Sequence, residues 1–519
     1  MASWNLYFLL KLYLYFKGSL VPLWGVNLLF ILVLIVPLRR RWLRVVRALA
    51  GLAVAFPLMY YESTLPPFAH LVEQFGGIMK FDTRYLLELA SRFFPATLLA
   101  GAAAALVAYF VINRWVRVST FVLIAFLVLP VWRSAETQLR ALSRPVTVAM
   151  ANVPAPAGAQ PMVAAGDYDG FLARFRQTEA TRKVSFKPAD TRARFDIILI
   201  HICSLAWDDL RAAKALHNPL LSHFDYLFTN FSSAVSYSGP AAIRLLRADC
   251  GQAPHKDLYQ RAPQGCYLMS TLKQEGYTPE VALNHDGRFD DFIGDVMRNI
   301  EVPDVKPMSL EGVPTAMQAF DGSPIRDDFA TLDRWWKNRQ SVAGPVALYY
   351  NTITMHDGNH LPDSNLTSVQ SYPLRVNKLM NEIDRFADVI QASGRKAVLV
   401  FVPEHGAALD GDSGQIAGLR DIPTPKIINI PVGVRLINFT GTRGPTQIIR
   451  EHTSYLALAQ LLANLVADSP FRPDAPPLIH YATDLPRTPM VGENEGTVTL
   501  QTPKGYVMRN TSGDWVAEK

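Results

Sequence analysis

Hydrophobic residues are arranged in two different ways along this chain. Up to residue 133 they form long, nearly uninterrupted runs. From residue 194 onward they form short runs rich in β-branched residues, and these alternate with stretches in which apolar residues recur at helical spacing. Long runs are typical of helices that cross a bilayer, and the alternation is typical of an α/β domain. We therefore expect a membrane part followed by a large α/β domain.

Four long apolar runs predict the membrane helices. They lie near Leu20–Pro37, Val45–Tyr61, Phe93–Ile112 and Val118–Trp132. A spanning helix needs about 20 residues, and somewhat shorter spans are tolerated, so we expect about four helices within residues 19–133. Residues 1–18 are aromatic and leucine-rich and carry Lys11 and Lys17, which predicts a helix in the membrane interface. Residues 1–18 have neither the basic first residues nor the small-residue cleavage site of a signal peptide.

Basic residues near these runs predict their orientation. The sequences "LRRRWLR" after the first run and "NRWVR" after the third are strongly basic, and cytoplasmic loops are enriched in Lys and Arg. The loop Glu62–Arg92 and everything after Trp132 should therefore lie outside the cytoplasm. The formal net charge of +6 is spread over 519 residues, which argues against a nucleic-acid partner.

Composition divides the rest of the chain into three parts. Residues 134–193 are rich in Ala, Pro and Gly in their first half, which predicts a linker with one short helix near Tyr168–Thr178. Residues 194–470 carry the alternating pattern of the α/β domain. Residues 471–519 end in alternating polar and apolar positions with turn signals, which predicts a β-rich tail.

Strands and helices can be assigned within residues 194–470. Buried strands are predicted in "FDIILIHI", "GPVALYYNTIT" and "RKAVLVFVPEHG". An amphipathic helix is predicted in "LRVNKLMNEIDRFADVIQASG", which Gly394 ends, and a later helix in "HTSYLALAQLLANLV". Strands that alternate with helices predict an α/β sandwich with a mostly parallel central sheet.

Residues with metal-binding chemistry follow the predicted strands. They are Cys203, His356, His360, Glu404 and His405. Ligands bind beyond the carboxyl ends of strands in open α/β sheets. Cys, Glu and His are ligands of zinc, which takes S, N and O donors in tetrahedral sites. These residues therefore predict a metal site at one edge of the sheet.

A serine at a predicted helix start could complete this site. In "SYSGPAAIRLLR", Ser238 precedes Gly239 and Pro240, and proline favours the first turn of a helix. A helix start carries free N–H groups and favours phosphate. Metal coordination would lower the pKa of the Ser238 hydroxyl and make it a nucleophile.

Each candidate taken alone has a simpler interpretation. Cys203 could be a core thiol, Ser238 a helix cap, and Glu404 the partner of a surface arginine. The three histidines could be ordinary loop residues. The combination of a thiol, a helix-start serine and a Glu-His-Gly sequence, all at element ends, favours the metal site.

The two remaining cysteines enclose a short loop. Cys250 and Cys266 could form a disulfide in an oxidising compartment. The alternative is three reduced thiols, with Cys203 as the third.

Several short sequences resemble one enzyme superfamily. A metal ligand after the first strand, a serine at a helix start and an acid-His-Gly after a late strand are similar to the arrangement in alkaline phosphatases and sulfatases. Within that superfamily, "YSGPA", "HDGNH" and "PEHGAALDGD", followed by "QIAGLRDIP", carry a more specific resemblance. Along nearly the whole chain the resemblance is to the BcsG family of cellulose phosphoethanolamine transferases. Lipopolysaccharide-modifying relatives usually carry a carboxylate where Cys203 stands, a threonine nucleophile and Asp-His-Gly. The resemblance implies a sulfatase/alkaline-phosphatase-like α/β/α sandwich.

This resemblance implies a role for each candidate residue. Zinc is held by Cys203, Ser238, Glu404 and His405. Ser238 attacks phosphatidylethanolamine and passes phosphoethanolamine to the glucose 6-hydroxyl of cellulose. Tyr237 and Arg420 contact the phosphoryl oxygens. His356 moves protons or steadies the phosphate, and His360 is a further candidate for the same pocket.

The resemblance also implies a cellular setting. It places a multi-pass protein in the bacterial inner membrane, with its catalytic domain in the periplasm beside the inner-membrane cellulose synthase complex. It further implies that Cys250 and Cys266 are bridged and that Cys203 is free.

Two other kinds of function are compatible with the same residues. One is a phosphodiesterase or another lipid or glycan phosphoethanolamine transferase of the superfamily. The other is a non-catalytic membrane scaffold of a polysaccharide-secretion complex. A scaffold that had lost catalysis would lack Ser238 or a ligand, and this sequence retains them all.

Overall fold

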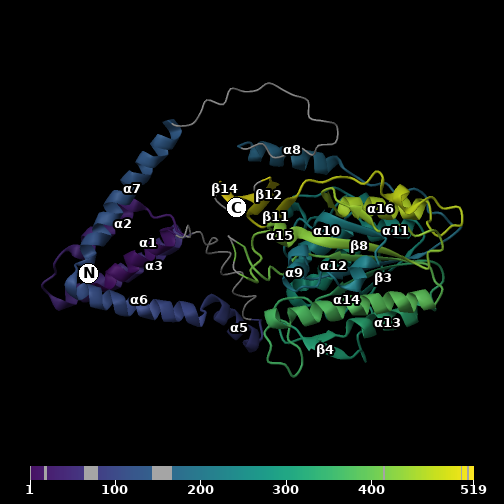
Figure 1. The fold of residues 1–519 in the computed structure, drawn as a ribbon, viewed down its shortest axis with the longest axis horizontal. Coiled ribbons are helices and arrows are strands. Elements are labelled where there is room, and N and C mark those ends of the chain that lie inside the picture. The colour runs from purple at the N-terminus through teal and green to yellow at the C-terminus, as the bar shows by residue number, and fades with distance from the viewer. Residues whose placement is uncertain are drawn as a thin grey trace. The chain divides into compact units, whose positions relative to one another are not determined.

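The computed structural model of the chain describes residues 2–16, 20–63, 80–142, 166–412, 415, 417–503, 505–510 and 513–518. Two compact units divide the chain. The helical unit comprises Met1–Lys80 and Leu89–Ala157, and the sheet unit comprises Phe81–Glu88 and Gly158–Lys519. Figure 1 labels the elements of both units.

The helical unit contains helices at all four predicted apolar runs. Its helices are α1 (Ala2–Phe16), α2 (Trp24–Ile35), α3 (Arg41–Glu62), α6 (Ala96–Trp115) and α7 (Val118–Leu142), and α5 (Thr83–Phe93) has residues in both units. Among the described residues, α3 and α6 are long and apolar enough to cross a bilayer. Helix α2 and the apolar part of α7, Val118–Trp132, are shorter. A membrane part of about four spans therefore stays a prediction.

Helix α1 packs into the helical unit through one face. Phe8 is buried and contacts Phe30 of α2 edge to face. Lys11 is also buried; it donates to the side-chain oxygen of Asn27 over 2.7 Å and pairs with Glu62 at the end of α3. Such partners offset the cost of burying a charge. The position of α1 in the membrane interface remains a prediction.

A mixed, mostly parallel sheet forms the centre of the sheet unit. Its strands are β1 (Asp196–Ile202), β2 (Tyr226–Ser232), β3 (Thr278–Leu283), β6 (Val346–Thr352), β7 (Ala397–Pro403), β8 (Asn429–Ile437), β9 (Gln447–Ile449) and β10 (Thr453–Ser454). The strand order is β10-β2-β8-β7-β1-β6-β3, and β9 also pairs with β2. Only β8, among these described strands, runs antiparallel to its neighbours, β2 and β7. The predicted fold class is confirmed.

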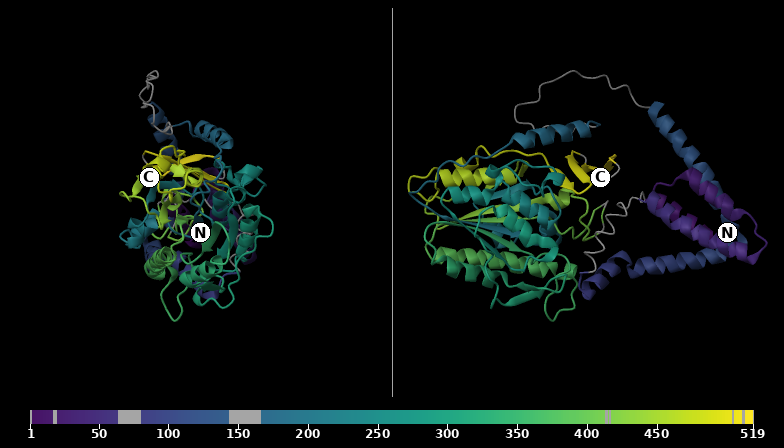
Figure 2. Two further views of the ribbon diagram at one scale, coloured as in Figure 1. Left: turned by 90° about the vertical axis from the view of Figure 1, so that its right-hand side faces the viewer. Right: turned by 180° about the vertical axis from the view of Figure 1, so that it is seen from behind.

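Alternate residues of the central strands face two separate hydrophobic layers. In β1, Ile197 and Leu199 belong to one buried cluster, and Ile198 and Ile200 belong to the other. Residues of α10 (Ser238–Leu246), α11 (Leu268–Gln274), α12 (Phe292–Ile300) and α16 (Tyr455–Ala467) pack in the first cluster. Residues of α9 (Trp207–Ala212), α13 (Asp328–Arg339) and α14 (Ser368–Ala392) pack in the second. Figures 1 and 2 show the sheet between these helices, which makes the unit an α/β/α sandwich.

The helices of the sheet unit include those expected from the sequence. They are α8 (Tyr168–Thr181), α9 (Trp207–Ala212), α10 (Ser238–Leu246), α11 (Leu268–Gln274), α12 (Phe292–Ile300), α13 (Asp328–Arg339), α14 (Ser368–Ala392), α15 (Pro425–Ile428) and α16 (Tyr455–Ala467). Helix α14 begins six residues before the predicted stretch because Thr367 caps its first turn together with Gln370. It ends before Gly394, whose φ is 73°.

Two small sheets complete the sheet unit. The tail forms a four-stranded antiparallel meander of β11 (Val491–Asn494), β12 (Thr497–Thr502), β13 (Gly505–Arg509) and β14 (Trp515–Glu518). Its apolar face packs on Phe171 and Phe175 of α8. The other sheet is a hairpin of β4 (Thr315–Gln318) and β5 (Pro324–Arg326).

The sheet unit also includes eight residues from the stretch between α3 and α6, Phe81–Glu88. Phe81 stacks on Phe289 and meets the ring of Phe320 edge to face. The backbone N–H of Asp82 donates to the carbonyl oxygen of Phe320 over 2.8 Å. The sequence pattern had assigned this segment to the membrane part, because an isolated short segment carries no local sign of the surface on which it packs.

The structure decides between the two interpretations of the cysteines. Cys250 and Cys266 form a disulfide, and Cys203 is free and buried. The disulfide closes a loop between α10 and α11.

Candidate active site

The carboxyl ends of β1 and β7 bring three predicted ligands together. Ile202 and Pro403 are paired in the sheet register, and the backbone N–H of Glu404 donates to the carbonyl oxygen of Ile202 over 2.8 Å. The next residues on each strand, Cys203, Glu404 and His405, therefore lie side by side. One ligand atom from each of these three buried residues lies within 4.8 Å of the others.

Helix α10 adds the predicted serine to this cluster. Ser238 is the first residue of the helix, as its sequence predicts, and Tyr237 occupies the N-cap position. The Ser238 hydroxyl lies 3.3 Å from the Cys203 thiol and 3.5 Å from Nε2 of His405. This hydroxyl therefore faces the potential ligands.

The side chains of the cluster are oriented as metal ligands require. Asn351 donates to Oε1 of Glu404 over 2.6 Å, while Oε2 of the same carboxylate is buried and has no hydrogen-bond partner in the part of the chain that the structure describes. Nδ1 of His405 donates to the carbonyl oxygen of Gly406 over 2.9 Å, which leaves Nε2 free as a ligand. An orphaned buried carboxylate oxygen, a free imidazole nitrogen and a thiol fit a divalent cation of the zinc type.

Burial alone would keep this cluster uncharged. Burial, followed by the charge of Glu404, raises the pKa of the Cys203 thiol to about 12. Burial also raises the pKa of Glu404 and lowers that of His405. A bound cation reverses this preference, because it favours the thiolate, the carboxylate and the neutral imidazole.

Arg420 and His356 lie beside the cluster. One guanidinium nitrogen of Arg420 donates to the Ser204 hydroxyl over 2.7 Å, and the other lies 3.5 Å from Nε2 of His356. The His356 ring donates from Nδ1 to the carbonyl oxygen of Asp357 over 2.6 Å and stacks on Phe320 with centroids 4.3 Å apart. Burial and the charge of Arg420 lower the pKa of His356 to about 3, so its imidazole is neutral.

Tyr237 and His360 are placed differently from the rest of the predicted site. Tyr237 is 37% exposed, and its hydroxyl donates to the carboxylate of Asp421, next to Arg420. His360 instead pairs through its backbone with Gln318 of β4. Neither ring nitrogen of His360 has a hydrogen-bond partner among the described residues. The structure thus ties His360 to the β4–β5 hairpin through its backbone.

Two supporting residues were not found by sequence reasoning. Asn351 orients Glu404 and is itself oriented by His285, which donates to its side-chain oxygen over 2.8 Å. A polar residue within the apolar run "VALYYNT" was a usable signal. Asn494 of β11 donates to the backbone of Asp421 over 2.9 Å and to the Ser236 hydroxyl over 2.6 Å. Nothing local in the tail indicates this contact.

The Asn351→Ala variant should bind zinc about 10–100-fold more weakly, because loss of an outer-shell partner has that effect on metal sites. The affinity can be measured on the full chain by competition with a chelator. Asn299→Ala is the matched control, since Asn299 is also buried and hydrogen-bonded but lies on α12 and bonds to Arg247. Equal affinities of the two variants would remove Asn351 from the metal site.

Two protein-family models match the chain. The model of the cellulose biosynthesis protein BcsG N-terminal domain matches residues 4–131. The model of the cellulose biosynthesis protein BcsG C-terminal domain matches residues 153–515.

Individual proteins match over nearly the full length. The chain is 37% identical to cellulose biosynthesis protein BcsG of Escherichia coli K12 and 36% identical to that of Salmonella typhimurium LT2, with 99% of this chain and 96% of each relative covered.

Solved structures are similar at lower identity. A protein of the alkaline phosphatase superfamily from Vibrio parahaemolyticus is 11% identical, with a TM-score of 0.47 over 67% of this chain and 87% of that one. Lipooligosaccharide phosphoethanolamine transferase A from Neisseria meningitidis is 10% identical, with a TM-score of 0.42 over 77% and 80%.

Proposed function

The chain belongs to the BcsG family of cellulose biosynthesis proteins, and from this premise we propose that it transfers phosphoethanolamine from phosphatidylethanolamine to the glucose 6-hydroxyl of cellulose. The observation that carries the proposal is the Ser238 hydroxyl, which lies at a helix start within 3.5 Å of both Cys203 and His405. A helix start is a favourable place for a phosphate, and a nucleophile is activated by a neighbouring metal.

Zinc is the cofactor that we propose. Cys203, Glu404 and His405 would hold it, and Ser238 would supply the fourth ligand atom; this donor set suits zinc. When bound, the ion supplies Lewis-acid chemistry, which lowers the pKa of a coordinated hydroxyl and stabilises negative charge.

In the first step, the Ser238 oxygen attacks the phosphorus of phosphatidylethanolamine. A bond forms between this oxygen and phosphorus, and the bond from phosphorus to the diacylglycerol oxygen breaks. Diacylglycerol leaves with the proton that the Ser238 hydroxyl gives up, and phosphoethanolamine stays esterified to Ser238. Arg420 and the free N–H groups at the start of α10 face the phosphoryl oxygens and stabilise their charge.

In the second step, the 6-hydroxyl oxygen of a glucosyl unit bonds to the same phosphorus and the bond from phosphorus to the Ser238 oxygen breaks; the proton of the sugar hydroxyl ends on the released Ser238 oxygen. The neutral His356 ring can accept the proton of this hydroxyl at Nε2, because its Nδ1 is already held by the carbonyl oxygen of Asp357. Two displacements at Ser238 replace one difficult displacement between a lipid and a polymer.

We further propose that the sheet unit lies in the periplasm beside the inner-membrane cellulose synthase complex. The apolar helices α3 and α6 support an anchor in the membrane, and the basic sequences that follow the first and third apolar runs support the orientation. A lipid donor requires an active site at a membrane surface.

The test uses the full chain in lipid nanodiscs that contain phosphatidylethanolamine, with cellopentaose as acceptor. We expect mass spectrometry to find phosphoethanolamine on the Ser238 peptide before the sugar is added and on cellopentaose afterwards. A group released only to water would identify a phosphodiesterase. A chain that modifies neither Ser238 nor the sugar and binds no zinc would be a scaffold.

A further inference from the structure

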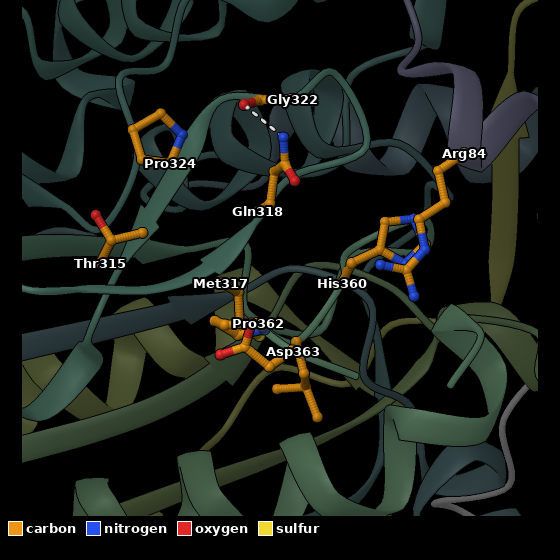
Figure 3. A pocket seen from close by; sticks show the side chains of 10 residues that line it. Arg84, Thr315, Met317, Gln318, Gly322, Pro324, His360, Pro362 and Asp363 are labelled. Atoms are coloured by element: carbon orange, nitrogen blue, oxygen red, sulfur yellow. Dashed lines mark hydrogen bonds between the residues drawn. The ribbon is translucent and has the colours of Figure 1, made fainter. Parts of the chain in front are cut away.

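A cavity of about 400 Å³ lies in the sheet unit, apart from the predicted ligands. Its walls come from three segments: the β4–β5 hairpin, the loop that begins at His360, and the segment Phe81–Glu88. Figure 3 shows the side chains that line it, among them Arg84, Gln318 and His360. Its volume is within the range of small-ligand sites.

His360 indicates that the cavity receives a polar ligand. Its side chain is 2% exposed, yet neither ring nitrogen has a hydrogen-bond partner among the described residues. A buried polar group without a partner is costly and uncommon. Burial, followed by the charge of Arg84, lowers the pKa of His360, so the neutral ring offers one donor and one acceptor.

The lining favours a ligand with hydroxyl groups over an anion. The Gln318 amide donates to the carbonyl oxygen of Gly322 over 3.3 Å, which leaves its side-chain oxygen as an acceptor. The Thr315 hydroxyl accepts from Arg326 over 2.7 Å and can still donate, and Met317 adds an apolar surface. The guanidinium of Arg84 already donates to the carbonyl oxygen of Ser364 over 2.6 Å, and the carboxylate of Asp363 adds a negative charge to the lining. A sugar ring presents hydroxyl edges and apolar faces, which match these walls; a phosphate does not.

Short connections join the cavity to the candidate active site. Gln318 and His360 exchange backbone hydrogen bonds of 3.0 and 2.9 Å. Two residues after Gln318, Phe320 stacks on His356, and His356 lies four residues before His360. The hairpin and the His356–His360 loop therefore extend from the active site to the cavity.

The segment Phe81–Glu88 holds the far wall of the cavity in place. The Tyr85 hydroxyl donates to Asp357 over 2.9 Å, and the carboxylate of Glu88 accepts from the backbone N–H of Ser368 over 3.1 Å. Asp357 precedes His360 and Ser368 follows it, so these two contacts hold the loop on both sides of His360. A site built in this way is preorganised, which lowers the entropy lost on binding.

We propose that this cavity is a subsite for a glucosyl unit of the acceptor glucan, with His360 and Gln318 as its hydrogen-bonding residues. This subsite rests on the proposed function, because its ligand would be the acceptor of that reaction. The subsite holds the chain beside the active site, while the reacting hydroxyl belongs to another unit of the same glucan.

The test measures binding and transfer separately, on the full chain in nanodiscs. Cellopentaose binding by calorimetry should be about tenfold weaker for His360→Ala and also weaker for Gln318→Ala, whose side chain is exposed and whose backbone pairing is kept. The KM for cellopentaose should rise in both variants. The extent of phosphoethanolamine attachment to Ser238 should remain unchanged.

His217→Ala is the control, because His217 is exposed and lines a different hollow of about 420 Å³. It should bind cellopentaose like the unaltered chain.

Equal binding of cellopentaose by His360→Ala and by the unaltered chain would overturn the subsite. Transfer to cellopentaose without measurable binding in the unaltered chain would overturn it as well. Loss of Ser238 modification in His360→Ala would assign the cavity to the lipid donor instead. Failure of the unaltered chain to modify Ser238 would refute the proposed function, while the binding result would still decide whether the cavity takes a glucan.

Discussion

The Ser238→Ala variant is expected to transfer no measurable phosphoethanolamine to cellulose, a loss of transfer rate on the order of 10⁴-fold or more. The physical reason is that the alanine methyl group cannot attack phosphorus, so neither displacement can take place. The measurement is the phosphoethanolamine content of cellopentaose after incubation with the full chain and phosphatidylethanolamine.

This variant should keep its fold and its metal. The Ser238 hydroxyl bonds to Cys203 and His405, and Tyr237 rather than Ser238 occupies the N-cap position of α10, so removal of the hydroxyl leaves the helix and the three other ligands in place. Ser222→Ala is the matched control, since Ser222 lies at the surface and bonds only locally to Pro219. If Ser238→Ala still modified the sugar, the nucleophile would have to be another group.

The Cys203→Ala variant is expected to bind zinc more than about 100-fold more weakly, which exceeds the effect of losing an outer-shell partner. Cys203 provides the only sulfur ligand of the described cluster, and its loss leaves a carboxylate and an imidazole as the remaining strong ligands. Zinc stoichiometry should be measured by elemental analysis of the purified full chain, and transfer should fall with it.

Cys203→Asp is the informative comparison, because a carboxylate is also a zinc ligand. It should recover part of the zinc that Cys203→Ala loses. The disulfide between Cys250 and Cys266 is independent of both changes, and its presence on a non-reducing gel reports that the sheet unit has folded. Unchanged zinc stoichiometry in Cys203→Ala would exclude Cys203 from the site.

Local sequence patterns were sufficient for the elements that carry the site. The β-branched runs predicted β1, β6 and β7, because a strand buried on both faces must be apolar throughout. Pro240 after Ser238 predicted a helix start, and Gly394 predicted the end of α14. The residues at these ends were therefore identifiable before any contact between them was known.

The antiparallel strand β8 shows where the pattern was insufficient. All of its residues but the first are buried, as in a parallel strand, and the direction of a strand is set by the connections around it rather than by its composition. The place of β8 between β2 and β7 depends on pairing across the sheet, which the local pattern does not specify.

The sequence by itself determined the strands and helices that carry the site, the family, and the set of residues with metal-binding chemistry. Only the tertiary structure decided that Asn351 holds Glu404, that Asn494 holds the loop at Asp421, and that Tyr85 reaches Asp357. The reason is physical. Apolar periodicity, caps and turns act between near neighbours in the chain, whereas a hydrogen bond between residues far apart exists only after sheet register and helix packing have fixed both partners.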